Sequence, residues 1–184
     1  MSLAVAKPEL AIPANYSIQP AAKEHLRAIP AIEVAAVSTF AEADIPLEIR
    51  YRVTDPDVLE DARAGGRLWV ALDRNDRAIG FAMLEIMDGL AHLDEIDVHP
   101  DHAMQGIGSG LLRKTIDWAM GVKYPAMTLV TFRHLPWNAP FYEKFGFCEI
   151  ERDALSAELR ELLQDEAATG LNMENRIAMR LSLE

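Results

Sequence analysis

The chain has 184 residues, of which half are hydrophobic and 26% are charged, a composition typical of a folded domain rather than a disordered segment. Its 29 acidic residues outweigh its 18 lysines and arginines, and the net charge of −11 argues against binding nucleic acid through a basic face. This charge favours a small cationic partner, and no apolar run reaches the roughly 20 residues that a membrane helix needs.

The first part of the chain predicts one strand and two helices. Residues 16–19 alternate as a short strand, and the alanine-rich stretch 21–40 predicts a helix that bends or restarts at Pro30. A second helix begins at 55–57, where an acidic cap precedes a proline in the first turn. The glycine pair 65–66 ends it.

Three strands follow at 67–72, 78–87 and 91–98. The polar cluster 73–76 joins the first two as a hairpin, and Asp88-Gly89 predicts a second tight turn. The remaining chain predicts helices at 105–122, 138–145 and 154–168, and strands at 127–131, 147–150 and 177–183. These elements predict a mixed α/β domain with an antiparallel front and at least one strand–helix–strand unit.

Apolar spacing predicts that Ile107, Leu111, Thr115, Trp118 and Val122 share the buried face of the helix 105–122.

Cys148 is the only cysteine, which excludes an internal disulfide and favours a reducing, cytoplasmic location. We expect it to be a small buried hydrophobic residue. The N-terminal residues lack the pattern of a signal peptide. None of the five histidines has metal-ligand spacing, so no metal site is expected.

A glycine-rich loop lies between the strand 91–98 and the helix 105–122. Gly106 and Gly108 let the backbone turn tightly, and the free amides of the first helical turn form an anion site suited to a pyrophosphate. A glycine-rich helix start that merely packs against the sheet is the alternative. No lysine followed by serine or threonine comes after these glycines, and their spacing departs from G-x-G-x-x-G, which argues against the two common nucleotide loops.

Two motifs together carry a family resemblance. Val98-His99-Pro100 with the run 105–112, and Trp137-Asn138-Ala139-Pro140-Phe141-Tyr142 with the run 143–147, resemble the GNAT superfamily of acyl-CoA-dependent N-acetyltransferases. The resemblance implies a single acetyltransferase domain over 1–184, with 1–13 as a flexible N-terminal segment. It also implies a mixed, mostly antiparallel sheet that splays at the cofactor site and carries helices on both faces.

The resemblance implies acetyl-CoA as the cofactor, with its pantetheine arm along the strand that ends at Val98 and its pyrophosphate on the glycine loop. Ala103 departs from the family's first loop position, so a side-chain contact to the phosphates is lost there. The cofactor-binding residues that it implies are Ile96, Asp97, Val98, Gln105, Gly106, Ile107, Gly108, Ser109, Gly110, Asn138 and Tyr142.

Transfer to an amine needs a group that accepts the ammonium proton. We favour Asp94, with Glu95 and His92 as second choices; polar residues on a splayed strand are often only solvated, and this alternative stays open. The period of two places His92 and Asp94 on the face of Ile96, opposite Glu95 and Asp97, unless a bulge changes the phase.

Tyr142 is the candidate proton donor to the leaving thiolate, because the family commonly places a tyrosine there. A phenol with an ordinary pKa near ~10 stays protonated at neutral pH. Tyr142 is alternatively a core aromatic beside Phe141 and Phe145. Asn138 resembles the family's cofactor-contacting asparagine and is also a good helix cap.

The leading hypothesis is an N-acetyltransferase for a small primary amine, acting by direct attack in a ternary complex. A catalytically silent acyl-CoA sensor, or a transferase for protein N-termini or lysines, is the alternative. The resemblance implies an acceptor pocket built by residues 40–63 and by the segment after the strand 127–131. In the first region Glu42, Asp44, Glu48, Asp55 and Asp57 would attract a cation. Neither nucleic acid nor a membrane is an expected partner; a homodimer is expected from the family.

Overall fold

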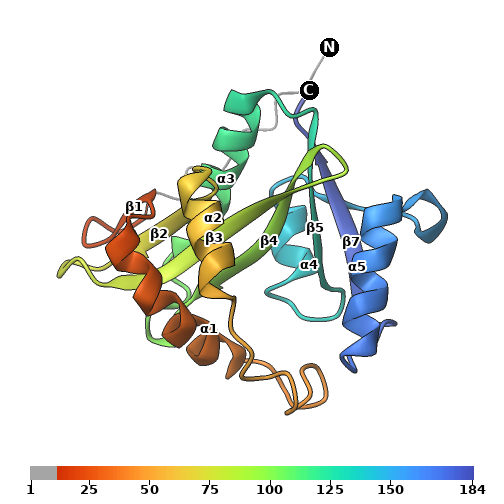
Figure 1. Cartoon of the computed structure of the whole chain (residues 1–184), viewed down its shortest axis with the longest axis horizontal. Coiled ribbons are helices and arrows are strands. Elements are labelled where there is room, and N and C mark those ends of the chain that lie inside the picture. Colours follow the sequence, from red (N-terminus) through yellow and green to blue (C-terminus); the bar gives the residue numbers. More distant parts are fainter. Residues whose placement is uncertain (1–11) are drawn as a thin grey trace.

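The computed structural model describes residues 12–184, so most of the segment 1–13 that the sequence predicts to be flexible lies outside the described residues. The described part contains one seven-stranded sheet in the order β1-β2-β3-β4-β5-β7-β6 (Figure 1). Of its neighbouring pairs only β4 and β5 are parallel. The strands are β1 (Ser17–Pro20), β2 (Leu68–Leu72), β3 (Ala78–Met87), β4 (Leu90–Val98), β5 (Ala126–Phe132), β6 (Cys148–Glu149) and β7 (Arg176–Ser182).

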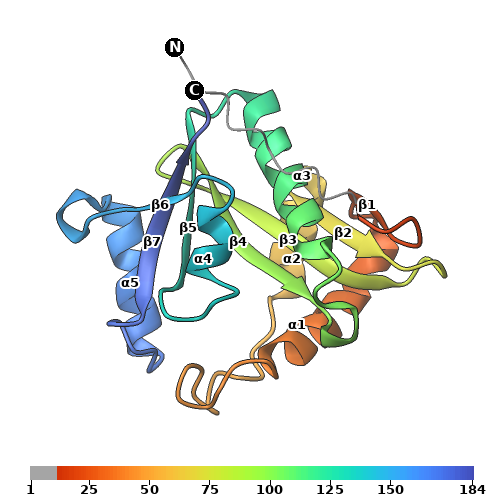
Figure 2. The same ribbon diagram turned by 180° about the vertical axis from the view of Figure 1, so that it is seen from behind.

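Helices cover both faces of this sheet, as the family resemblance implies. The helices α3 and α4 pack on one face and are seen in front in Figure 2, whereas α1, α2 and α5 pack on the other. Short 3-10 turns precede α1, α3 and α5 at Lys23–Ala28, Pro100–His102 and Arg152–Ala154. The α-helices are α1 (Ile29–Val37), α2 (Pro56–Ala64), α3 (Ile107–Val122), α4 (Ala139–Glu143) and α5 (Ala157–Ala168).

Local sequence signals set the ends of these helices. The stretch 21–40 does restart, because Pro30 lies in the first turn of α1. The Asp55 carboxylate accepts a 2.8 Å hydrogen bond from the amide of Asp57 and caps α2 as predicted. Gly66 follows α2 with a φ of +67°, a conformation that glycine adopts without strain.

Two burial predictions are wrong. Cys148 is exposed, because β6 is a two-residue edge strand and its partner in the register, Arg180, also faces solvent. Val122 is 50% exposed, so the buried face of α3 ends about one turn earlier than the spacing indicates.

Candidate active site

The strands β4 and β5 separate in the middle of the sheet. They pair only where Ala91, His92 and Leu93 lie opposite Met127, Thr128 and Leu129. Beyond this point β5 continues beside β7, while residues 94–98 of β4 have no strand partner on the β5 side (Figure 2). The splay that the family resemblance implies is therefore present, and it leaves a main-chain edge free inside the sheet.

A β-bulge occupies the point where the strands separate. Leu84 of β3 lies opposite Leu93, and its neighbour Met83 lies opposite Glu95. Asp94 is therefore the extra residue of β4. Bulges of this kind redirect side chains and are frequent beside active sites.

The bulge overturns the predicted side-chain phase of β4. Glu95 lies opposite Met83, which belongs to the core beneath α1 and α2. Ile96 instead packs in the core beneath α3, together with Leu93. The prediction that His92 and Asp94 share the face of Ile96 is therefore wrong, because the extra residue breaks the alternation between them.

Glu33, Thr54 and β4 form a hydrogen-bonded group on the face that α1 covers. Glu33 is 5% exposed, and its Oε1 accepts from the Thr54 amide at 3.1 Å and from the Thr54 hydroxyl at 2.6 Å. The same hydroxyl lies 3.2 Å from Glu95 Oε2. The Thr54 hydroxyl therefore links the carboxyl groups of Glu33 and Glu95. Glu33 Oε2 is buried with no partner among the described residues.

Glu33, Asp94, Glu95 and Asp97 together form what we call the acidic cluster. The surrounding protein, followed by the charges of Glu85, Glu166 and Glu33, raises the pKa of Asp94 to about 7, although its side chain still reaches solvent. Burial likewise raises the pKa of Asp97 to about 7. Burial and the neighbouring carboxylates, Asp97 foremost, raise the pKa of Glu95 well above its usual range. Asp94, Glu95 and Asp97 therefore keep their protons to a higher pH than ordinary carboxyl groups do.

His92 is poorly placed to act on a substrate. It is 2% exposed, and its Nδ1 lies 2.8 Å from the Thr128 hydroxyl. Burial lowers the pKa of His92 to about 4, so the ring is neutral at physiological pH. The structure thus removes the second of the two alternatives to Asp94 and leaves Glu95.

Tyr142 lies in the core beneath α3 and α4. Its ring packs against Phe141 and Phe147, with centroids 5.1 and 5.9 Å apart. Burial, assisted by the charge of Asp97, raises the pKa of Tyr142 while Arg176 opposes the shift, so the phenol stays protonated. Asn138 stands at the N-cap of α4, yet its side chain makes no capping hydrogen bond.

The glycine loop opens α3 with free amides. Gly106 has a φ of +79° and precedes the helix, and no main-chain carbonyl of the described residues accepts from the amides of residues 105–109. Gly108 lies beside β4, since a Cβ there would stand 4.0 Å from Val98 Cγ2. A free β4 edge and unpaired helical amides thus adjoin, which suits an elongated ligand with an anionic group.

Gly110 has a different role from the one predicted. Its amide donates to the carbonyl of Gly106 at 2.9 Å, so it is not available to a phosphate. A Cβ at this position would stand 2.6 Å from Ile18 Cδ1, and Gly110 therefore lets α3 approach β1 closely.

The segment after α1 meets the loop after β5, as expected for the wall of an acceptor pocket. Phe40 packs against Phe132 and Trp137, with ring centroids 5.6 and 6.3 Å apart. His134 Nε2 lies 2.8 Å from Asp44 Oδ1.

Two charged residues of the segment 40–63 make hydrogen bonds within the fold and are therefore less available to an acceptor. Arg50 turns inward to the carbonyls of Val37, Phe40 and Ile45 at 3.0–3.2 Å, and Asp55 is a helix cap.

Sequence reasoning missed Glu33 and the ion pair between Arg176 and Glu166. Glu33 is an acid within the buried stripe of α1, which also contains Ile29, Ile32 and Ala36, and this anomaly was a usable signal. Arg176 donates to Glu166 from Nε at 2.9 Å and from Nη2 at 2.5 Å. No local pattern indicates this pair, because its partners come from separate elements.

Within residues 12–184, no cluster of three His, Cys, Asp or Glu side chains has a geometry that would hold a metal ion. In the same part of the chain no helix is both long and apolar enough to cross a membrane.

A family model described as acetyltransferase (GNAT) family matches residues 35–147. Among solved structures, a GNAT-family acetyltransferase from Staphylococcus aureus Mu50 is 18% identical with a TM-score of 0.69, over 92% of this chain and 99% of that one. A putative acetyltransferase from Salmonella typhimurium, solved with its cofactor acetyl-CoA, is 20% identical with a TM-score of 0.67, over 92% and 95%. The ribosomal-protein-S18-alanine N-acetyltransferase of Escherichia coli is 19% identical with a TM-score of 0.62, over 92% and 94%. At these identities the structural matches show the fold alone.

Proposed function

Because this chain belongs to the acetyltransferase (GNAT) family, we propose that it transfers the acetyl group of acetyl-CoA to the primary amine of a small molecule, by direct attack in a ternary complex. The observation that carries the proposal is the separation of β4 from β5 beside the free amides of α3. The relative from Salmonella typhimurium that shares this fold was solved with acetyl-CoA. When bound, acetyl-CoA supplies the acetyl group as an activated thioester.

The residues present fit such a ligand. The main chain of Ile96, Asp97 and Val98 would bind the pantetheine arm, since this edge has no strand partner. The amides of residues 105–109 would bind the pyrophosphate at the positive end of the α3 dipole. Asn138 would contact the cofactor through its side-chain amide, which is not used as a helix cap. Gly110 is not among the phosphate-binding residues, because its amide already donates to the Gly106 carbonyl.

Asp94 is our choice for the proton acceptor. Its side chain reaches solvent, and its pKa of about 7 matches the operating pH of a general base. Glu95 is the second choice, because its carboxyl group is half-buried and already hydrogen-bonded to the Thr54 hydroxyl. Asp94 would take the proton of the bound ammonium and leave a nucleophilic amine.

Tyr142 is our choice for the proton donor to the departing thiolate. Its raised pKa keeps the phenol protonated throughout the pH range in which Asp94 titrates. The donor and the acceptor therefore stay in opposite protonation states, as general acid–base catalysis requires.

The acidic cluster supports a cationic acceptor. An incoming ammonium would offset the repulsion among Asp94, Glu95 and Asp97, and the unpartnered Glu33 Oε2 adds a further carboxylate oxygen behind them.

The test is the release of free thiol from acetyl-CoA with a panel of amines, diamines, amino acids and lysine peptides. We expect release with a small amine, a loss of about 100-fold or more in kcat for Asp94→Asn, and no change for the remote turn variant Asp76→Asn. Release with peptides alone would indicate a protein acetyltransferase. Acetyl-CoA binding without release would indicate the silent sensor.

The organisation as one acetyltransferase domain, the homodimer and the cytoplasmic location stay predictions from the sequence and the family. Gel filtration with light scattering tests the homodimer directly.

A further inference from the structure

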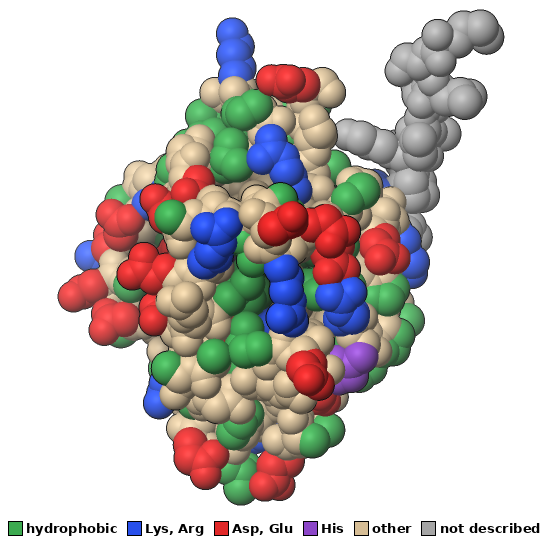
Figure 3. All heavy atoms as spheres, turned by 90° about the vertical axis from the view of Figure 1, so that its right-hand side faces the viewer, with side chains coloured by type: hydrophobic (Ala, Val, Ile, Leu, Met, Phe, Trp, Pro, Cys, Tyr) green, Lys and Arg blue, Asp and Glu red, His purple; other side chains and the backbone are tan. Residues whose placement is uncertain are grey.

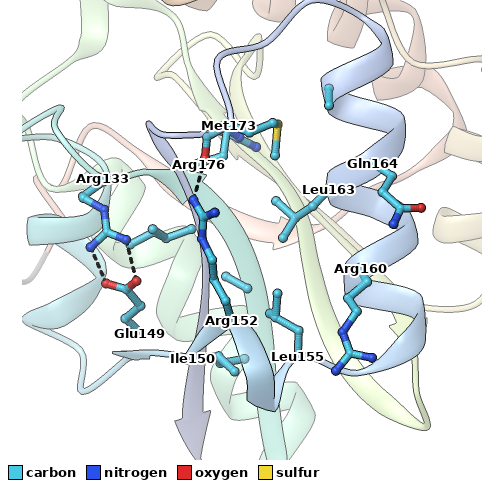
Figure 4. A pocket seen from close by; sticks show the side chains of 13 residues that line it. Arg133, Glu149, Ile150, Arg152, Leu155, Arg160, Leu163, Gln164, Met173 and Arg176 are labelled. Atoms are coloured by element: carbon cyan, nitrogen blue, oxygen red, sulfur yellow. Dashed lines mark hydrogen bonds and ion pairs between the residues drawn. The ribbon is translucent and has the colours of Figure 1, made fainter.

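A groove of about 310 Å³ lies between α5 and the strands at the far edge of the sheet (Figure 4). Leu163 of α5 and Leu155 before it supply apolar lining, and Ile150, Met173 and Ile177 continue this lining on the sheet side. In Figure 3, which faces this side of the molecule, basic side chains lie beside a hydrophobic hollow, with acidic side chains next to them. None of the four residues of the acidic cluster lines the groove.

The charge of this groove is opposite to that of the chain. Arg133, Arg152, Arg160 and Arg176 line it together with Glu149, and Glu166 pairs with Arg176 from beside it, which leaves a net charge of +2 in a chain of −11. Positive charge beside an apolar groove favours an anion as the ligand.

Two of these arginines are committed within the fold. Arg133 makes a bidentate contact to Glu149 at 2.6 and 2.5 Å, and Arg176 makes its bidentate contact to Glu166. Arg176 also lies 4.4 Å from the centre of the Phe132 ring.

The other two reach only main-chain carbonyls. Arg152 Nη2 lies 3.4 Å from the Met173 carbonyl, and Arg160 Nη2 lies 3.3 Å from the Asp153 carbonyl. Among residues 12–184, neither has a carboxylate within 4.0 Å. Figure 4 shows Arg152 extended along the groove towards Met173, with Arg160 on the side of α5. Their remaining N–H groups are available to a ligand.

We propose that this groove binds a small organic anion that carries an apolar group, with its carboxylate or phosphate held by Arg152 and its apolar part against Leu155 and Leu163, while Arg160 adds positive charge from the side of α5. Guanidinium groups match the geometry of both anions. The volume accommodates a small molecule rather than a folded partner. An exposed ion pair alone is weak, so the apolar contact must supply much of the affinity.

The test is calorimetric titration of the purified chain in the absence of acetyl-CoA. The probes are acetate and hexanoate for the carboxylates, and inorganic phosphate and hexyl phosphate for the phosphates. We expect the hexyl compound of at least one pair to bind about tenfold or more tightly than its short counterpart. Arg152→Gln should weaken that binding by about tenfold and Arg160→Gln by less, whereas Arg74→Gln, at an exposed arginine in the β2–β3 turn, should leave it unchanged. The pair that shows the effect identifies the head group.

Equal affinity of the native chain and Arg152→Gln, or no binding of either hexyl compound at millimolar concentration, would overturn the proposal. Binding of an acidic peptide that depends on both arginines, with no binding of the small anions, would overturn it in favour of a protein-docking surface. Because no acetyl-CoA is present, a failure of the proposed transferase activity leaves this result unaffected.

Discussion

The acidic cluster and the groove that Arg152 and Arg160 line are on the same face of the sheet, but they carry opposite charges in different surroundings. In the acidic cluster, carboxyl groups crowd one another within the protein, and the pKa values of Asp94 and Asp97 rise to about 7, where protons are exchanged at neutral pH. In the groove, Arg152 and Arg160 are exposed and present guanidinium groups to solvent. Crowded like charges thus favour proton transfer, whereas exposed guanidinium groups favour only binding.

One ion pair connects the two regions. Arg176 lines the groove, while the charge of its partner Glu166 contributes to the raised pKa of Asp94. Variants on either side of this pair therefore separate catalysis from anion binding.

A large effect, similar to that of Asp94→Asn, is expected for Tyr142→Phe. Removing the proposed proton donor should lower kcat by about 100-fold while leaving hexyl-anion binding in the groove unchanged. Steady-state thiol release and the calorimetric titration measure both quantities on one preparation. An unchanged kcat and pH profile would refute the donor role and leave Tyr142 as a core aromatic residue.

A smaller kinetic effect is expected for Glu33→Gln. The amide oxygen can still accept from Thr54, so the fold should be kept, but one negative charge is removed from the acidic cluster. We expect kcat/KM for a diamine to fall about tenfold relative to that for a neutral-side-chain amino acid. The pH midpoint of activity should also move to lower pH, because Glu33 contributes to the raised pKa of Asp94. Thr39→Val, outside the cluster, is the control.

Breaking the ion pair between Arg176 and Glu166 should lower the stability of the fold and leave the catalytic rate nearly unchanged. In Arg176→Gln the Glu166 carboxylate, whose side chain is 18% exposed, loses its bidentate partner. We expect a loss of about 2 kcal/mol, or roughly 4–8 °C in Tm for a chain of this size. Thermal unfolding measures it, with Arg74→Gln as the matched control; an unchanged Tm would mean that solvent replaces the pair fully.

The smallest effect is a pH dependence of stability. The folded chain keeps the Asp94 proton up to about pH 7, whereas the unfolded chain releases it near its ordinary value of 3.8. Stability from this group therefore falls as the pH rises from about 4 to 7. His92, with its pKa lowered to about 4, contributes the opposite slope between pH 4 and 6.5.

The difference between the native chain and Asp94→Asn isolates the carboxyl contribution. The gain in Tm of Asp94→Asn over the native chain should be larger at pH 7.5 than at pH 5. An identical difference at both values would contradict the raised pKa.

Much of the architecture follows from local sequence signals. The cap at Asp55, the restart at Pro30 and the turn at Gly106 depend on a few adjacent residues, and the structure has each where the sequence predicts it. The glycine loop and the tyrosine motif also predicted the family, which the family model confirms over residues 35–147.

Only the tertiary structure decided which acids meet. The bulge at Asp94 depends on how β3 and β4 pair, and no residue of β4 predicts it. The simple alternation therefore placed His92 and Asp94 on the wrong face relative to Ile96. Glu33 and Glu95 are 62 positions apart and are joined through Thr54 because α1 packs across β4. Gly110 serves close packing against Ile18 rather than a phosphate. The sequence by itself determined the elements and the loop, which short-range sterics and hydrogen bonds specify, whereas the charge environment depends on long-range contacts that form only when the sheet is assembled.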